Sequence, residues 1–322
     1  MWNPILEGFA LFYFLIIILG EIMGWRIICI EEACRINYKL NSIGVLQKDE
    51  VVWINLDEID IIIIESLYCN TTIKLLTEIS KKGINVLFCG ENHMPIGVLT
   101  SINDNQRTAK YNRIQFGWKK EVKQRVWTKI IKHKILLQIV CLYKLNKMDK
   151  IEILKNYMNE VENGDITNRE GLAAKVYFHE LFGLDFVRTR KAEDIINSSL
   201  NYIYQVIRAK LAQEIIAHGY IPTLGIYHCS EYNYFGLADD FIEVYRPIVD
   251  FYVVQLINEE NVTYLTPFFK EKLLNLLYSN IQFGNSKHKI IESIRLFIVN
   301  ITDSISNEKV DEIIFPYFYD EN

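Results

Sequence analysis

The chain has 322 residues, of which 50% are hydrophobic and 13% aromatic, with only 6 prolines, and this composition excludes a largely disordered protein. Its length allows two domains or one large one, and its formal charge of −5 is mildly acidic. The six cysteines form no Cys-x-x-Cys pair or Cys/His cluster, so a structural zinc site is not expected. Scattered thiols of this kind are typical of the reducing cytoplasm.

The amino-terminal segment is unusually apolar between residues 8 and 20. The run is short for a membrane span, and it lacks the basic start and cleavage site of a signal peptide. A membrane anchor, a buried additional element and an extension upstream of a natural start at Met23 remain open. We expect the third, in which residues 1–22 form an apolar extension that takes no part in the fold.

Residues 23–100 are expected to form a small β-rich domain. Apolar, β-branched stretches alternate there with turn residues, and one short helix is expected over 72–82, capped near Thr71 and closed by Gly83. The expected strands cover 25–30, 38–46, 51–64 and 84–89.

A linker rich in Gly, Asn, Asp and Pro is expected over about 90–106, and helical spacing dominates beyond it. The sequence therefore predicts an α+β protein, in which a larger all-α domain over 101–322 follows the β-rich domain. The expected helices cover 110–145, 151–162, 167–182, 192–218, 237–258, 270–279, 288–300 and 304–314.

Separate segments supply possible ligands for a divalent cation. Glu170 lies in Thr-Asn-Arg-Glu-Gly (167–171), where it could instead complete a helix capping box with Thr167. His228 lies in a Gly- and Pro-containing connection, where a structural hydrogen bond is the alternative role. Asp240 and Glu243 fall on one helix face, which could simply be solvated. If two carboxylates and the imidazole meet, they form a metal site able to act on a phosphodiester.

Pro247 adds a backbone signal beside this candidate ligand set. Its ring cannot donate to the carbonyl of residue 243, so the helix should bend there. Arg246 could then hold a phosphate or pin a carboxylate, and Asp250 could orient Arg246.

Residues 107–150 carry 13 Lys/Arg and only two acids, whereas the rest of the chain has 22 basic and 38 acidic residues. Aromatic residues such as Trp118 and Trp127 are interleaved with these cations, a pattern typical of surfaces that neutralise phosphates and stack on bases. An ordinary helix whose aromatic side chains face the core is the alternative. The expected DNA contacts are Lys119, Lys120, Lys123, Arg125, Arg188, Arg190 and Arg246.

From residue 23 to about residue 250, the chain resembles the CRISPR-associated endonuclease/integrase of spacer acquisition, the Cas1 family, most closely its type II form. Each motif that carries the resemblance is weak alone, but their order along the chain is specific. The motifs are Gly24-Trp25-Arg26, Asn85-Val-Leu-Phe-Cys89, Lys123-Gln-Arg-Val-Trp127, Thr167-Asn-Arg-Glu-Gly171 with Ala173-Ala-Lys-Val-Tyr177, Leu200-Asn-Tyr202, Leu224-Gly-Ile-Tyr-His228 and Asp240-Phe-Ile-Glu-Val-Tyr-Arg-Pro-Ile-Val-Asp250.

The resemblance implies a β-rich dimerisation domain, a helical catalytic domain, and Mg²⁺ or Mn²⁺ held by Glu170, His228 and Glu243, with Asp240 as an auxiliary acid. It implies a cytoplasmic homodimer that joins the companion protein Cas2 in a heterohexameric complex. The implied reaction inserts spacer DNA into a double-stranded repeat array by transesterification. A plain metal-dependent nuclease acting by hydrolysis and a non-catalytic DNA-binding scaffold are the alternatives.

Overall fold

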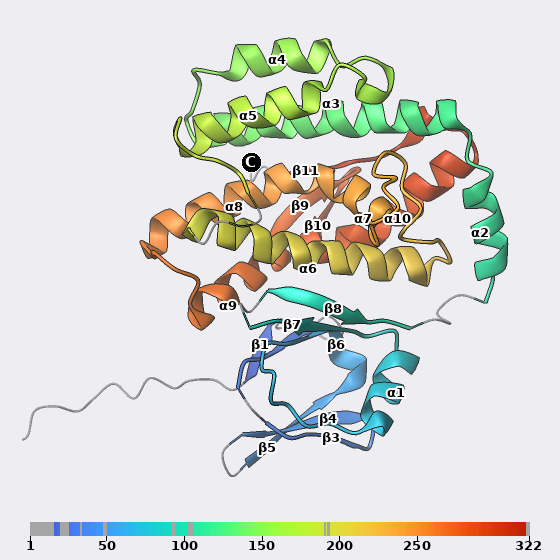
Figure 1. Cartoon of the computed structure of the whole chain (residues 1–322), viewed down its shortest axis with the longest axis vertical. Coiled ribbons are helices and arrows are strands. Elements are labelled where there is room, and N and C mark those ends of the chain that lie inside the picture. Colours follow the sequence, from blue (N-terminus) through green and yellow to red (C-terminus); the bar gives the residue numbers. More distant parts are fainter. Residues whose placement is uncertain are drawn as a thin grey trace, which may run out of the picture.

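The computed structural model describes residues 16–19, 26–32, 34–47, 50–91, 94–101, 106–189, 191 and 194–319. A β-rich part, blue to cyan in Figure 1, lies at one end of the molecule, and a mostly helical part makes up the rest (Figure 1). The predicted α+β class is therefore confirmed. No helix in the described ranges is both long enough and apolar enough to cross a membrane.

A five-stranded sheet with the order β1-β2-β6-β7-β8 lies between the small end and the helices. Its central strands β2 (Arg26–Ile30), β6 (Ile59–Ile64) and β7 (Asn85–Cys89) are parallel, and β1 (Ile16–Leu19) and β8 (Pro95–Leu99) pair antiparallel at the edges. Side chains of β2 and β6 alternate between two hydrophobic cores, one on each face of the sheet. Burial on both faces explains the uninterrupted isoleucine run of β6.

Both edge strands differ from the expectation. Strand β1 lies within the segment 1–22 that was expected outside the fold, and Ile16 pairs with Ile30 of β2. Strand β8 lies within the expected linker 90–106. Each strand pairs antiparallel with the strand next to it along the chain, β1 with β2 and β8 with β7. Met23, the expected natural start, lies outside the described residues.

A second sheet closes the small end. Its strands β3 (Ile36–Lys39), β4 (Ser42–Gln47) and β5 (Glu50–Asn55) are antiparallel, and Leu40 and Asn41 turn the chain with positive φ angles of 48° and 58°. One strand was expected over 38–46, but this tight turn divides it. Helix α1 (Ile73–Lys81) packs beside the sheet; its cap is Thr72, whose side chain accepts from Leu75 N.

The helical part begins with α2 and α3, where a single helix was expected over 110–145. The chain leaves helical geometry at Lys119, which has an extended backbone, and α3 then runs for 25 residues. The helices are α2 (Thr108–Phe116), α3 (Lys120–Lys144), α4 (Ile151–Asn159), α5 (Arg169–Phe182), α6 (Ile195–Ala217), α7 (Gly236–Phe241), α8 (Arg246–Glu260), α9 (Pro267–Asn275) and α10 (Ile290–Ser306).

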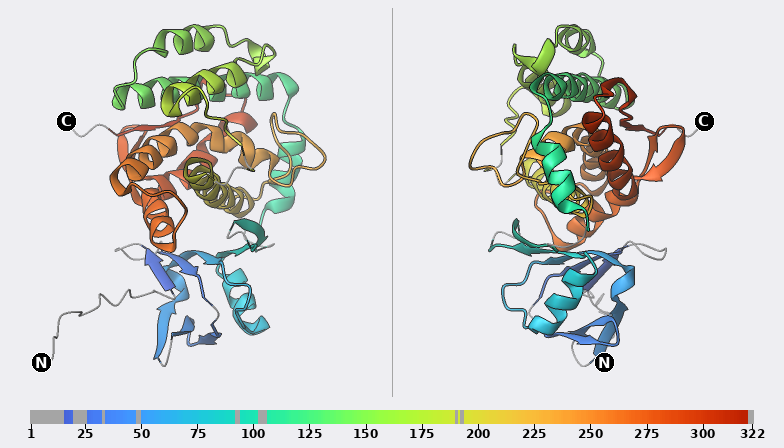
Figure 2. Two further views of the ribbon diagram at one scale, coloured as in Figure 1. Left: turned by 60° about the vertical axis from the view of Figure 1, so that its left-hand side comes forward. Right: turned by 90° about the vertical axis from the view of Figure 1, so that its right-hand side faces the viewer.

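The helices form layers above the sheet. Helix α6 lies directly on the sheet, whereas α3, α4 and α5 form the layer farthest from it (Figures 1 and 2). Between these layers the chain breaks at a 3-10 turn, Ile242–Val244, and α8 begins with Pro247 in its first turn. The break expected at this proline is therefore confirmed.

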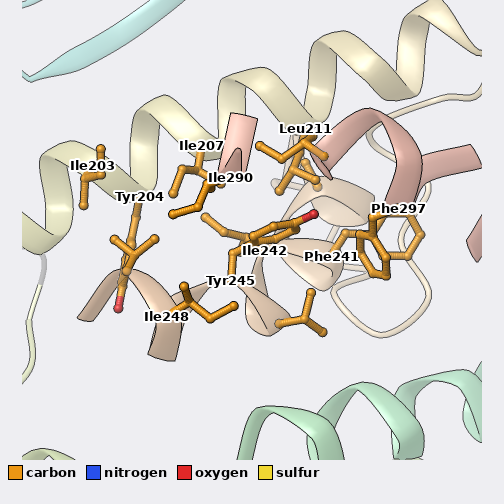
Figure 3. Close-up of a cluster of buried hydrophobic side chains, with 14 of the residues drawn as sticks. Ile203, Tyr204, Ile207, Leu211, Phe241, Ile242, Tyr245, Ile248, Ile290 and Phe297 are labelled. Carbon is orange, nitrogen blue, oxygen red and sulfur yellow. The ribbon is translucent and has the colours of Figure 1, made fainter. Parts of the chain in front are cut away.

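Figure 3 shows how this break is held in place. Ile207 and Leu211 of α6 pack with Phe241 and Tyr245 around the turn, and Phe297 of α10 packs edge-on against both aromatic rings. Full burial of each such side chain contributes roughly 1.5–3 kcal/mol to folding. The turn that carries Glu243 is thus part of the rigid core.

The carboxyl-terminal part is mostly helical, but it is not all-α as expected. A three-stranded sheet with the order β10-β9-β11 joins β9 (Asn280–Phe283), β10 (Ser286–Lys289) and β11 (Pro316–Phe318). The helix expected over 304–314 is wrong, because α10 continues to Ser306 and Glu308 then adopts a positive φ of 60°. Between Glu308 and residue 314, the only helical geometry is a 3-10 turn, Val310–Glu312.

Candidate active site

Glu170 and Glu243 both contact the buried ammonium group of Lys134. Lys134 of α3 places Nζ 2.5 Å from Glu170 Oε1 and 2.5 Å from Glu243 Oε2. The exposed side-chain fractions are 7% for Lys134, 5% for Glu243 and 23% for Glu170. The fold therefore brings together two carboxylates that lie far apart in the sequence and leaves one of them partly open to solvent.

Glu170 is available because other residues cap α5. Asn168 is the N-cap, with a left-handed backbone (φ 52°), and its side chain accepts from Gly171 N. The Asp165 carboxylate accepts from Arg169 N at 2.8 Å and Glu170 N at 3.0 Å. The capping box with Thr167 is therefore wrong. Its absence frees the Glu170 carboxylate, which lies near the positive end of the helix dipole.

His228 is oriented by Asp240. Its Nδ1 lies 2.8 Å from Asp240 Oδ1, and the same fully buried carboxylate accepts hydrogen bonds from the backbone N–H groups of Ile226, Tyr227 and His228. A carboxylate at Nδ1 favours the tautomer whose Nε2 carries a lone pair. The oxygens of Asp240 are thus used as hydrogen-bond acceptors within the protein, whereas Nε2 of His228 remains able to bind a cation.

The loop around His228 depends on close backbone contacts. A Cβ at Gly236 would lie 2.4 Å from the His228 carbonyl oxygen, and one at Gly225 would lie 2.7 Å from it, so both positions require glycine. Trp127 of α3 stacks on Tyr227 at 4.3 Å and meets the His228 ring edge-on at 5.5 Å. Trp127 is only 1% exposed. The expectation that it stacks on bases is wrong, and it holds this loop against α3.

Charges couple the members of the site. Burial lowers the pKa of His228, but Asp240 and Glu243 outweigh it, so the pKa is raised. Burial raises the pKa of Glu243, yet Arg246, Lys134 and His228 lower it overall. Burial likewise lowers the pKa of Lys134, and the two glutamates raise it overall. His228 and Glu243 therefore affect each other's charge.

Arg246 and Arg188 lie beside the carboxylates. Arg246 Nε lies 3.1 Å from Glu243 Oε1, and its guanidinium lies 4.8 Å from the centre of the Tyr204 ring. The Tyr204 hydroxyl donates to Asp250, so Asp250 holds the ring over which Arg246 lies, and its expected orientation of Arg246 stays a prediction. Arg188 lies 5.4 Å from the same ring and donates to two asparagine side chains. A cavity of about 420 Å³ is lined by Lys134, Glu170, Phe178, Arg188, Tyr204 and Arg246, among others.

The donor set suits a divalent cation. Glu243 Oε2 is buried and lacks a well-formed hydrogen bond, although Lys134 is close to it. Two carboxylates and an imidazole nitrogen are ligands that Mg²⁺ and Mn²⁺ accept. The ligand atoms of Glu170, His228 and Glu243 are not all within 4.8 Å of one another, and Lys134 lies between the two carboxylates.

A different group of possible ligand atoms in the described part of the chain does lie within 4.8 Å of one another: Cys29, Glu31 and Glu65. Glu65, however, forms an ion pair with Lys270 and accepts hydrogen bonds from Tyr202 and Cys29. Its acceptor capacity is therefore used within the protein, and the group forms a buried link between the sheet and the helical part.

The basic range 107–150 has acidic partners that sequence spacing did not reveal. Lys119 lies 2.6 Å from Glu308, and Arg125 and Lys129 lie 3.5 Å and 2.7 Å from Asp311. Lys119, Lys120 and Arg125 are exposed and Lys123 is half-buried, so all four remain accessible to a ligand. Trp118, which lies beside these cations in the sequence, is only 8% exposed and belongs to the core. Arg190 lies outside the described residues.

Sequence reasoning missed Lys134 as a member of the site, because it counted as one cation of the basic stretch. Its helical phase could have identified it. Lys134 follows Trp127 by two helical turns and lies among buried residues such as Ile131, Ile135 and Gln138. A lysine on the apolar face of a helix requires buried acidic partners, here Glu170 and Glu243.

The chain belongs to the Cas1 family: residues 27–277 match the family described as CRISPR associated protein Cas1. It is 30% identical over 295 residues to the CRISPR-associated endonuclease Cas1 of Neisseria meningitidis serogroup C, covering 91% of this chain and 96% of that protein. The resemblance inferred from the sequence motifs is confirmed.

Two solved structures share the fold. A casposase bound to integration product has a TM-score of 0.70 and 18% identity, covering 89% of this chain and 91% of that chain. A Cas6-RT-Cas1–Cas2 complex has a TM-score of 0.75 and 18% identity, covering 91% of this chain and 36% of that much longer chain.

Proposed function

We propose that this protein is a metal-dependent DNA endonuclease and integrase that inserts spacer DNA into a CRISPR repeat array by transesterification. One observation carries the proposal: Glu170 and Glu243 converge on the buried ammonium of Lys134, and Asp240 orients His228, whose charge acts on Glu243. Membership of a family whose curated relative is named an endonuclease supports a reaction at DNA phosphodiester bonds.

In this proposal, Glu170, Glu243 and Nε2 of His228 hold Mg²⁺ or Mn²⁺. When bound, the ion supplies charge stabilisation at the attacking and leaving oxygens of the scissile phosphate. The imidazole ligand favours Mn²⁺ somewhat over Mg²⁺. Asp240 keeps the His228 ring in its ligating tautomer, so its role is positioning.

The arginines of the cavity bind the DNA backbone in this proposal. Arg246 and Arg188 each present a guanidinium to the cavity that Glu170 also lines, so phosphate oxygens there meet two fixed cations. The attacking group is the 3′-hydroxyl of the incoming spacer DNA. Water in its place gives hydrolysis, which is the plain-nuclease alternative.

The proposed partners follow the same reaction. We propose double-stranded spacer and repeat DNA as substrates, a homodimer formed through the β-rich domain, and Cas2 as the companion in a heterohexamer. The fold is shared with a Cas1–Cas2 complex and with a casposase bound to integration product, which supports both the companion and the substrate. A cytoplasmic location, where the DNA substrates and reduced thiols are found, completes the proposal.

The test is a joining assay with the full-length chain, the companion Cas2, a short duplex with 3′-hydroxyl ends and a supercoiled plasmid that contains repeats. Wild-type protein with Mn²⁺ should form branched products. Glu170→Ala or chelation should abolish joining and leave DNA binding largely intact, whereas Glu180→Ala, on the same helix, should join normally. Joining that survives Glu170→Ala refutes the metal assignment.

The products distinguish the alternatives. Cut ends without branched DNA indicate a plain nuclease. DNA binding through the basic range 107–150 that Glu243→Ala leaves unchanged, with no joining and no cutting by either protein, indicates a scaffold.

A further inference from the structure

Two half-buried cysteines lie together on the β-rich part, away from the candidate active site. The Sγ atoms of Cys34 and Cys69 are 3.5 Å apart, and both residues are partly accessible to solvent. The other cysteines differ: Cys29, Cys89 and Cys141 are buried, and Cys229 is exposed in the His228 loop.

The sheet brings these two cysteines together. Strands β2 and β6 are parallel neighbours, with Ile30 paired with Ile64, and the segments that follow them continue side by side. Asn70 N donates to Cys34 O at 2.9 Å, and Ile36 N donates to Asn70 O at 2.8 Å. These bonds make a parallel bridge between Arg35 and Asn70, one residue beyond the cysteines. Cys34 and Cys69 are therefore in register, and their side chains point to the same face.

We propose that Cys34 and Cys69 form a reversible disulfide when the protein meets a hydroperoxide. Residues paired across neighbouring strands have the short Cα separation that a disulfide requires, and small side-chain rotations can bring the two sulfurs into bonding distance. The proposal does not depend on the proposed DNA reaction.

The surroundings assign a role to each sulfur. Either sulfur can donate in the contact between them. With Cys34 as the donor, and with a hydrogen bond from Ser66, the pKa of Cys69 is lowered to about 6 despite its partial burial. The same contact raises the pKa of Cys34. Cys69 is thus the thiolate that attacks, and Cys34 is the resolving thiol. The neighbouring Tyr68 is 78% exposed, which leaves the turn open to a small oxidant.

The oxidation takes place in two steps. The Cys69 thiolate attacks one oxygen of hydrogen peroxide, the O–O bond breaks, and protonation of the leaving hydroxide gives water and a sulfenic acid on Cys69. The Cys34 sulfur then displaces the sulfenic hydroxyl, which leaves as a second water, and an S–S bond forms. Two thiols are oxidised and one peroxide is reduced. A dithiol reverses the reaction by exchange.

The bond would tie the segment after β2 to the segment after β6. Because the cross-link constrains the unfolded chain, oxidised protein should unfold at a temperature about 5 °C higher than reduced protein. This shift is a second readout of the same bond.

The experiment treats the reduced full-length protein with stoichiometric hydrogen peroxide, then alkylates the remaining thiols for mass spectrometry. The expected wild-type product loses two hydrogens, blocks two of the six cysteines from alkylation, and yields one peptide pair linked through Cys34 and Cys69. Dithiothreitol should restore all six thiols. Cys229→Ser should behave as the wild type, because Cys229 is exposed but lies in a different part of the fold.

Cys34→Ser separates the two steps. It should stop at the sulfenic acid, so that dimedone labels Cys69, whereas Cys69→Ser should leave Cys34 unreacted. Two results overturn the proposal: a wild-type protein whose six cysteines all remain alkylatable after peroxide, or a disulfide that joins a different pair.

Discussion

Asparagine in place of Asp240 tests how His228 is held. The Asp240 carboxylate is fully buried and accepts from three backbone N–H groups and from Nδ1 of His228. An amide of the same shape offers one acceptor oxygen and two donor hydrogens. Its NH₂ group must therefore face at least one of these donors.

The size of the effect follows from that count. One buried donor left without an acceptor costs about 1–3 kcal/mol of folding free energy. Loss of the carboxylate behind a ligating histidine lowers metal affinity by about 10–100-fold. The second effect corresponds to about 1.4–2.7 kcal/mol of binding free energy. Asp240→Asn should therefore unfold at a lower temperature and bind Mn²⁺ more weakly.

Isothermal titration with Mn²⁺ and thermal unfolding measure the two effects separately. Asp239→Asn is the matched control, because Asp239 is also buried but contacts Asn233 and Arg208. It should keep the Mn²⁺ affinity within a few-fold of wild type. If Asp240→Asn binds Mn²⁺ as tightly as wild type while Glu170→Ala and Glu243→Ala do not, His228 is not a ligand and the reasoning fails.

Three further predictions concern pH, backbone space and DNA. Burial lowers the pKa of His133 to about 4, below its value in the unfolded chain. The neutral ring therefore stabilises the fold fully above about pH 6.5, and this stabilisation is lost as the pH falls towards 4. The free energy of unfolding should drop by about 2 kcal/mol from pH 7 to pH 5, a loss absent in His133→Gln. Gly236→Ala should disrupt the His228 loop and weaken Mn²⁺ binding, while Gly97→Ala, whose Cβ has only ordinary contacts, should not; equal Mn²⁺ titrations for the two would contradict the close approach. Lys123→Glu should lower the DNA affinity measured by fluorescence anisotropy. It should also reduce the slope of log affinity against log salt concentration by about 1, whereas an unchanged slope would place the DNA elsewhere.

Much of the architecture could be predicted because its signals are local. The isoleucine run of β6, the closing Gly83 of α1 and the break at Pro247 each depend on residues within one or two turns, although the cap of α1 is Thr72 and not Thr71 as expected. The same locality explains the error at the carboxyl terminus, since β11 is stabilised by β9, from which α10 separates it in the sequence.

The sequence by itself determined which chemical groups are present: a carboxylate at Glu170, an imidazole at His228 and a carboxylate at Glu243, in a motif order that identifies the family. Only the tertiary structure decided how they are used. It caps α5 with Asp165, frees Glu170, and places Lys134 between the two glutamates. The reason is physical: helical and strand periodicity encode which face of an element is buried, but which buried charges meet depends on packing between elements far apart in the chain.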